Sequence, residues 1–163
     1  MTLREKIDQD FKEAFKAQKE AQVSTLRLLL SSIKNREVEK RTKLSKTEAA
    51  EKLEELSKLG DEEIIGVISS EVKKRKDSAE QYKAGNRNEL AEKEEAEIKI
   101  LSVYLPEQLG EDEIRKMVKE AIQKSGAQSQ KEMGKVMGIL APQIKGKADG
   151  GLVSGIVKEE LYG

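Results

Sequence analysis

The sequence contains no His, no Cys and no Trp in its 163 residues. Without His, the side chain that most often shuttles protons near neutral pH is missing, and so is the commonest nitrogen ligand for zinc. Without Cys, there is no thiol nucleophile, no disulfide and no thiolate metal site. Acidic residues could still hold Mg²⁺ or Ca²⁺, but no EF-hand loop occurs and most acids alternate with Lys. We therefore predict no catalytic residue, no metal site and no cofactor.

Long apolar runs are also missing. No stretch approaches the ~18 residues that span a bilayer, and the N-terminal residues MTLREKIDQDFKEAF do not contain the apolar stretch of a signal peptide. We expect a cytoplasmic protein with no membrane contact. Charged residues make up 38% of the chain, which alone would favour disorder. However, the formal net charge is zero and apolar residues recur at helical spacing, so a folded chain is favoured.

The predicted fold class is all-α, because no alternating strand pattern occurs anywhere. Thr2 and Glu5 have the spacing of a capping box at the start of a first helix. A second helix is predicted at about 23–41, where Leu28 and Leu29 widen the apolar face. The apolar stripe of the first helix consists of Leu3, Ile7, Phe11, Ala14 and Phe15.

The middle of the chain predicts a helical hairpin. Ser45 and Glu48 have the spacing of another capping box, before a short helix, and Asp61 is a suitable N-cap for the long helix that follows. That helix is interrupted at 85–86, where Gly is followed by Asn, and another helix runs to about residue 104. We expect these two helices to be antiparallel.

Leu105-Pro106 is the clearest boundary, because proline disfavours helix at the residue before it. We predict an N-terminal multi-helix domain at 1–104 and a small C-terminal three-helix domain at 105–163. The three helices are expected at about 111–124, at about 129–141 and after the loop KGKADGG.

One charge falls on the apolar stripe of the hairpin. Arg75 shares its stripe with apolar residues, and Glu94 and Glu97 flank the facing point of the other helix. One interpretation is a carboxylate pair for acid–base chemistry, held by the arginine. The interpretation that we favour is a partly buried ion network that fixes the register of the hairpin.

Zero net charge conceals alternating blocks. Residues 27–46 contain seven basic and two acidic groups, and residues 47–63 contain two basic and seven acidic groups. Neighbouring helices can therefore neutralise one another. The alternative is a basic face for nucleic acid, although the pI near 6.5 and the few aromatic residues do not favour it. That face would consist of Arg27, Lys34, Arg36, Lys40, Arg41 and Lys43.

The loop KGKADGG places Lys145 and Lys147 on either side of a glycine, just before the last predicted helix. Backbone N–H groups at that helix start can bind a phosphate, with the lysines as counter-charges. The simpler interpretation is a flexible turn in which Asp149 is the N-cap. It is not a P-loop, because GxxxxGK[ST] is absent.

Together these segments resemble the GatB/YqeY family, in particular the small stand-alone YqeY-like proteins. The resemblance follows nearly the whole chain in order. It is carried by TLRLLLSSIKNREVEK (25–40), EVKKRKDSAEQYKAGNRNELAEKEEAEIKILSVYLPEQL (71–109), EMGKVMGIL (132–140) and KGKADGGLVSGIVKEEL (145–161).

The resemblance implies a two-domain helical protein whose C-terminal part is similar to the tail domain of the B subunit of Glu/Asp-tRNA amidotransferase. That tail is attributed to tRNA contact, and the chemistry occurs in a larger domain that this chain has no room for. The candidate phosphate contacts are the exposed cations Lys135, Lys145 and Lys147, with Lys131 a weaker candidate. Gly134 and Gly138 lie one turn apart, so we predict close helix packing there.

Three functions follow as hypotheses. The first is a non-catalytic accessory protein that binds tRNA or is linked to translation. The second is a protein–protein adaptor for a tRNA-aminoacylation or amidation enzyme. The third is a carbon–nitrogen ligase with glutamine as amido-N-donor, which rests on the family label alone. We expect a monomer.

Overall fold

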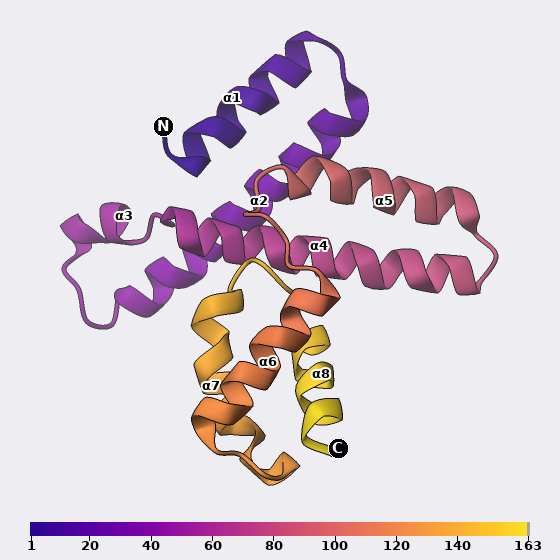
Figure 1. The fold of residues 1–163 in the computed structure, drawn as a ribbon. Coiled ribbons are helices and arrows are strands. Elements are labelled where there is room, and N and C mark those ends of the chain that lie inside the picture. Colours follow the sequence, from indigo (N-terminus) through magenta and orange to yellow (C-terminus); the bar gives the residue numbers. More distant parts are fainter. Residues whose placement is uncertain (163) are drawn as a thin grey trace. The chain divides into compact units, whose positions relative to one another are not determined.

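The computed structural model describes residues 1–162, and this part of the chain forms eight α-helices and two short 3₁₀-helices without a strand (Figure 1). The predicted all-α fold class is confirmed. The chain divides into two compact units, an N-terminal unit, Met1–Tyr104, and a C-terminal unit that begins at Leu105. Within the described residues, no helix is both long enough and apolar enough to cross a bilayer.

Five α-helices form the N-terminal unit. The long helices α4 and α5 lie side by side and run in opposite directions (Figure 1). Helix α1 packs on α2, which also contacts α3, α4 and α5. The helices are α1 Leu3–Lys16, α2 Glu20–Leu44, α3 Leu53–Leu56, α4 Asp61–Ala84 and α5 Asn88–Ser102, and the 3₁₀-helix η1 Ala50–Lys52 precedes α3.

Local sequence signals explain several helix ends. The Thr2 hydroxyl accepts a hydrogen bond from the Glu5 N–H at 3.2 Å, and the Glu5 carboxylate accepts one from the Thr2 N–H at 2.8 Å. The predicted capping box of α1 is therefore confirmed. Between α4 and α5 the chain turns at Gly85 and Asn86, and Asn86 has φ 57°, a left-handed conformation that Asn tolerates better than most residues.

Two predicted caps are wrong. Helix α2 continues to Leu44, so Ser45 ends that helix, and its hydroxyl donates to the Thr42 carbonyl at 2.7 Å. The N-cap of α4 is Gly60 rather than Asp61, because the Glu63 carboxylate accepts the Gly60 N–H at 3.0 Å.

Asp61, which is not the N-cap of α4, has a hydrogen-bond partner on α1. Its carboxylate accepts the N–H of Leu3 at 3.0 Å and so connects the first turns of α1 and α4. A carboxylate at the start of a helix is also favoured by the helix dipole.

In the N-terminal unit, the buried faces of α1 and α2 differ from the apolar faces that the sequence predicts. Ile7 and Ala14 of α1 are buried, but Phe15 is 61% exposed. On α2, Leu29 is 1% exposed and Leu28 is 54% exposed. Leu28 therefore lies outside the buried face of α2, and this face is narrower than the sequence predicts. The apolar residues buried in this unit are Ile7, Ala14, Leu26, Leu29, Ile33, Leu53, Leu59, Ile64, Ile68, Val72, Ala79, Ala91, Leu101 and Tyr104.

Three α-helices pack on one another in the C-terminal unit. Helix α6 ends at Gly126, which has φ 68°, the left-handed conformation of a C-terminal glycine cap. The helices are α6 Glu111–Ser125, α7 Met133–Ile144 and α8 Gly150–Tyr162, and the 3₁₀-helix η2 Gln130–Glu132 precedes α7. The buried core consists of Ile114, Val118, Ala121, Ala127, Val136, Leu140, Ile144, Val153, Ile156 and Val157.

Helix α7 extends beyond its predicted end at about residue 141. Pro142 lies inside its last turn, and the helix ends at Ile144. Proline removes one backbone donor, but Ile144 is 6% exposed, and its burial favours the helical last turn.

Candidate functional site

The first polar cluster surrounds Arg75, which is 8% exposed on α4. Its Nε donates to Glu97 Oε2 of α5 at 2.8 Å, and its Nη1 donates to Glu71 Oε2 at 2.8 Å. The same Nη1 also donates to the Glu71 carbonyl at 3.1 Å. One guanidinium therefore joins a carboxylate of its own helix to a carboxylate of the neighbouring helix.

Glu71 extends this network to α2, because the Ser32 hydroxyl donates to its Oε1 at 3.2 Å. Burial raises the pKa of Glu71, but the bonds from Arg75, Lys74 and Ser32 outweigh burial and leave this pKa lowered. For Arg75, burial lowers the pKa, and the two carboxylates outweigh burial and raise it. Both groups are therefore charged near neutral pH, which suits a structural ion pair better than a proton donor.

The structure brings together two of the three predicted network residues. Arg75 pairs with Glu97, whereas Glu94 lies outside the ion pairs that Arg75 makes in the described part of the chain. The sequence prediction missed Glu71, the second carboxylate. A signal for it was present, since a Glu four residues before an Arg is the favourable helical arrangement.

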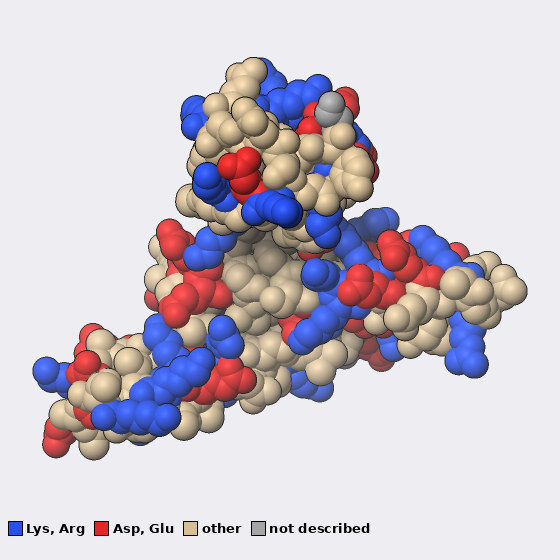
Figure 2. Space-filling model, turned by 90° about the horizontal axis from the view of Figure 1, so that it is seen from below, with Lys and Arg blue, Asp and Glu red and all other residues tan. Residues whose placement is uncertain are grey.

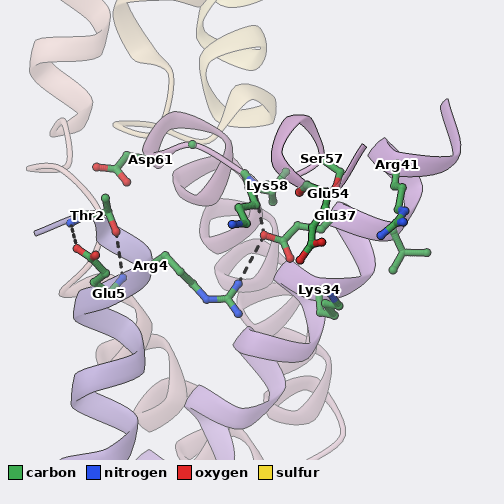
Figure 3. Close-up of a pocket in the computed structure, with 13 residues that line it drawn as sticks. Thr2, Arg4, Glu5, Lys34, Glu37, Arg41, Glu54, Ser57, Lys58 and Asp61 are labelled. Carbon is green, nitrogen blue, oxygen red and sulfur yellow. Dashed lines mark hydrogen bonds and ion pairs between the residues drawn. The ribbon is translucent and has the colours of Figure 1, made fainter. Parts of the chain in front are cut away.

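The second feature is a polar groove in the N-terminal unit with a volume of about 600 Å³ (Figure 3). Glu37 of α2 is one of its lining residues, and we call it the Glu37 groove. Four segments surround it: the start of α1, the second half of α2, α3 with the chain after it, and the start of α4. The lining residues are Thr2, Arg4, Glu5, Lys34, Glu37, Val38, Arg41, Glu54, Ser57, Lys58, Leu59, Gly60 and Asp61.

The carboxylate of Glu37 is 15% exposed and contacts two neighbouring segments. Its Oε1 lies 3.7 Å from Arg4 Nη1 of α1 and accepts the N–H of Leu59 at 3.4 Å. Sequence reasoning did not find this groove, because no single helix contains enough of its residues to produce a pattern.

The third feature is the turn between α7 and α8. The Gly146 carbonyl accepts a hydrogen bond from the Gln108 side-chain amide at 2.8 Å, and the Lys147 carbonyl accepts the N–H of Leu109 at 2.9 Å. Gly146 has φ 74°, a conformation that glycine adopts without strain. The turn backbone is thus held by the segment before α6, while the side chains of Lys145 and Lys147 are exposed.

Asp149 follows this turn and caps α8. Its carboxylate accepts the N–H of Leu152 at 3.2 Å, as the sequence predicts for an N-cap. Gly150 and Gly151, which form the exposed first turn of α8, come directly after it.

The four candidate lysines fall into two pairs at the two ends of α7. Lys131 and Lys135 lie at its start, where Lys135 Nζ is 3.3 Å from Glu132 Oε1. Lys145 and Lys147 follow its end. The structure therefore places the lysines in η2, at the start of α7 and in the turn after α7, but does not gather them at a single point.

The predicted close packing at the glycines of α7 is wrong. A side-chain carbon at Gly134 or Gly138 would meet no atom within 4 Å, and both residues are exposed. Helix α7 instead packs through the other side, where Val136 and Leu140 are both 0% exposed. Its glycine face is thus an open surface over which the backbone is accessible.

The basic block of α2 is partly neutralised. Arg36 pairs with Glu39 at 2.9 Å, and Lys40 of the same helix pairs with Glu63 of α4 at 2.9 Å. Lys34 and Arg41 line the Glu37 groove instead. On the face seen in Figure 2, basic and acidic side chains are intermixed. This arrangement agrees with the mutual neutralisation of neighbouring helices better than with a single basic face.

The fold and these sites define an all-helical protein of two units, with a buried arginine network, an open polar groove and a lysine-bearing turn. The profile of the Yqey-like protein family matches residues 4–161. The chain belongs to this family, as the sequence resemblance predicts.

Curated relatives carry the name "Altered inheritance of mitochondria protein 41, mitochondrial". The relative from Vanderwaltozyma polyspora is 31% identical over 99 residues, which are 61% of this chain and 46% of that protein. The one from Lachancea thermotolerans is 33% identical over 99 residues, again 61% and 46%. A third, from Pyrenophora tritici-repentis, is 27% identical over 145 residues, 88% of this chain and 71% of the relative. The match to the first two thus spans about half of their length.

Proposed function

We propose that the chain is a non-catalytic accessory protein whose C-terminal unit contacts tRNA. The observation that carries this proposal is the turn at Lys145 and Lys147, whose backbone is held at Gly146 and Lys147 by hydrogen bonds while both lysine side chains are exposed. A cationic turn with a fixed backbone can bind a phosphate with little loss of chain entropy.

Two neighbouring features support a phosphate contact. The first turn of α8 begins with two exposed glycines, and the positive end of a helix dipole favours an anion there. The open glycine face of α7 leaves room for a nucleic-acid backbone to approach at Gly134 and Gly138. Lys131 and Lys135 lie at the other end of this face and would contact a further phosphate.

We propose tRNA as the nucleic acid because the sequence of this unit resembles the tail of the tRNA amidotransferase B subunit. In that enzyme, amide transfer belongs to a larger domain, and the residues of this chain match its tail instead. We therefore propose binding without carbon–nitrogen ligase activity. The predicted location remains the cytoplasm, and the mitochondrial names belong to the relatives.

The proposal is tested by titrating the full chain into fluorescently labelled total tRNA at low and moderate salt. Wild type should bind at micromolar concentration, and the combined change of Lys135, Lys145 and Lys147 to Ala should weaken binding about tenfold or more. Each lost phosphate contact removes an attractive charge pair.

The matched control changes Lys116 and Lys119 to Ala. Both are exposed lysines of α6 in the same unit, and their loss should leave the affinity within about twofold. The proposal is abandoned if wild type does not bind at micromolar concentration, or if control and triple variant bind equally.

A second candidate function is a protein–protein adaptor for a tRNA-aminoacylation or amidation enzyme. The specific observation is Phe15, a 61% exposed aromatic side chain whose ring lies 6.4 Å from that of Phe11. Arg27 of α2 lies 5.9 Å from the Phe11 ring. Aromatic residues and arginine are enriched at protein interfaces. Association that tolerates salt and is lost in Phe15→Ser, without tRNA binding, would favour the adaptor.

A further inference from the structure

Both phenylalanines of the chain lie on α1, four residues apart, so their rings project from one side of the helix. Phe15 is 61% exposed, Phe11 is half-buried, and the two ring centroids are 6.4 Å apart. The guanidinium of the exposed Arg27, on α2, lies 5.9 Å from the centroid of the Phe11 ring. We call these three side chains the aromatic face. It places an open apolar side chain beside an arginine, close to the turn from α1 into α2.

Basic groups outnumber acidic ones around the aromatic face. Residues 11–27 contain four basic and two acidic groups, whereas residues 1–104 contain equal numbers of each. The basic residues of this segment, all exposed, are Lys12, Lys16, Lys19 and Arg27. Glu13 comes two residues before Phe15 and therefore points to the other side of α1, which leaves Glu20 as the acid of this segment that can oppose the four cations.

Two more acids of α1 are engaged within the N-terminal unit. The Asp8 carboxylate lies 3.2 Å from Arg4 Nε, and the Asp10 carboxylate accepts a hydrogen bond from the Tyr104 hydroxyl at 2.6 Å. Asp8 is thus matched by an arginine, and Asp10 is turned toward Tyr104, so positive charge remains in excess beside the rings. A partner that carries carboxylates is attracted to such a surface.

The turn next to the aromatic face has a fixed backbone. The N–H of Gln18 donates to the Phe15 carbonyl at 3.2 Å, and the N–H of Lys19 donates to the Ala14 carbonyl at 3.0 Å. Ala14 is 2% exposed, so the last turn of α1 is anchored in the core on its other side. Phe15 is therefore presented on a preformed backbone, and docking on it costs little ordering of this chain.

We infer that the aromatic face docks an acidic amphipathic helix of a partner protein. Two rings one helical turn apart match apolar side chains at positions i and i+4 of such a helix. Its flanking carboxylates would pair with the Arg27 guanidinium, which can bind a carboxylate in a bidentate manner, and with the lysines. The inference rests on the second candidate function, the adaptor, and specifies the chemistry of its partner.

The test measures the fluorescence anisotropy of a labelled synthetic helix as the full chain is added. The helix has about 16 residues, long enough for an isolated helix, with Leu at heptad spacing on one face and Glu on either side of it. Wild type should bind this acidic helix below millimolar concentration, and Phe15→Ser should bind it at least about tenfold more weakly, because aromatic anchors dominate such interfaces. Since Phe15 is exposed, the variant should keep its thermal midpoint.

The matched control is Leu90→Ser. Leu90 is an apolar residue of α5 in the same unit and is 39% exposed, and its loss should change the affinity by less than about twofold. No binding of the acidic helix, or equal losses in Phe15→Ser and Leu90→Ser, would overturn the inference.

A second helix, with Lys in place of every Glu, tests the charge of the partner. Wild type should bind it at least about tenfold more weakly than the acidic helix, and Arg27→Ala should weaken binding of the acidic helix about fivefold. If the basic helix binds as tightly as the acidic one and Phe15→Ser loses both, the adaptor stands and the acidic partner is wrong.

Two other occupants are outcomes of the same experiment. If total tRNA displaces the acidic helix, or if Phe15→Ser weakens tRNA binding, the aromatic face is an RNA contact and the inference fails. If wild type is a dimer that Phe15→Ser converts to monomers, a second copy occupies the face and the inference fails as well. The triple variant of the lysine turn should bind the acidic helix as wild type does, so this inference and the proposed tRNA contact can fail separately.

Discussion

The two units of the chain are stabilised in different ways. The N-terminal unit buries Thr25, Ser57 and Arg75 together with its apolar core, and Arg75 connects carboxylates of α4 and α5. In the C-terminal unit, by contrast, every buried residue of the described part is apolar. A polar network specifies which residues face each other, whereas an apolar core stabilises several similar packings almost equally well.

The two units also differ in where their basic residues lie. Basic residues of the N-terminal unit are partly used in ion pairs between helices, as Lys40 and Glu63 show, and Lys34 and Arg41 line the Glu37 groove. In the C-terminal unit, the lysine turn lies outside the small core and its side chains are exposed. This unit can therefore lose its lysines without losing its fold, which makes binding and stability separable.

The largest expected effect comes from the small core. Leu140→Ala empties a site that is 0% exposed in a unit of three short helices, and such changes cost about 3–4 kcal/mol, as much as a small unit has in total. We expect the C-terminal unit to unfold at 37 °C while the N-terminal amides remain protected in hydrogen exchange. Equal loss of protection in both units would show that their stabilities are not separate.

The arginine network should give the next largest effect. Arg75→Ala leaves two mostly buried carboxylates without their cation, and we expect a loss of about 3 kcal/mol in the free energy of unfolding. A double-mutant cycle in urea with Glu97→Ala should give a coupling energy of about 1–3 kcal/mol. In the parallel cycle with Glu94→Ala, the effects should be additive. A larger coupling with Glu94 than with Glu97 would contradict the observed geometry.

Acid should weaken the N-terminal unit through Glu71. The pKa of Glu71 is lower in the folded protein than its ordinary value of 4.5, so its contribution to stability is complete above about pH 4.5 and is lost as the pH falls through the folded pKa. Glu71→Gln should flatten this dependence in thermal unfolding between pH 5 and pH 3. The opposite result, a steeper acid loss in the variant, would exclude Glu71 as its source.

The smallest expected effect is a gain in stability. Gly138→Ala places a methyl group where no atom lies within 4 Å and should stabilise α7 by about 0.5–1 kcal/mol. If tRNA approaches the open glycine face, the same variant should bind tRNA more weakly although it melts higher. If Gly138→Ala instead lowers the melting temperature, Gly138 is closely packed, as the sequence predicted.

Local sequence signals predicted those parts of the fold that depend on neighbouring residues. The Thr2–Glu5 box, the N-cap at Asp149 and the break at Gly85 each involve contacts within a few positions of the chain. The predicted cap was wrong where two residues could cap the same helix. At the start of α4, the Glu63 carboxylate accepts the Gly60 N–H, and Asp61 is not the N-cap.

The candidate sites were harder to predict, because burial depends on distant segments. Phe15 fits the periodicity of α1 yet is exposed, and Gly134 and Gly138 fit a packing motif yet face open space. The Glu37 groove needs four segments that only the folded chain brings together. The lysine turn could be found, since Lys145 and Lys147 lie two residues apart in the sequence and their residue types already suggest phosphate.

The most direct test of the proposed tRNA contact is the salt dependence of tRNA affinity, measured for wild type and for Lys145→Ala/Lys147→Ala. Each phosphate contact contributes about 0.7–0.9 to the slope of the logarithm of affinity against the logarithm of salt concentration. The account predicts that the double variant reduces this slope by about 1–2 with no change in melting temperature. An unchanged slope, with tRNA still bound, would show that the lysine turn does not hold the RNA.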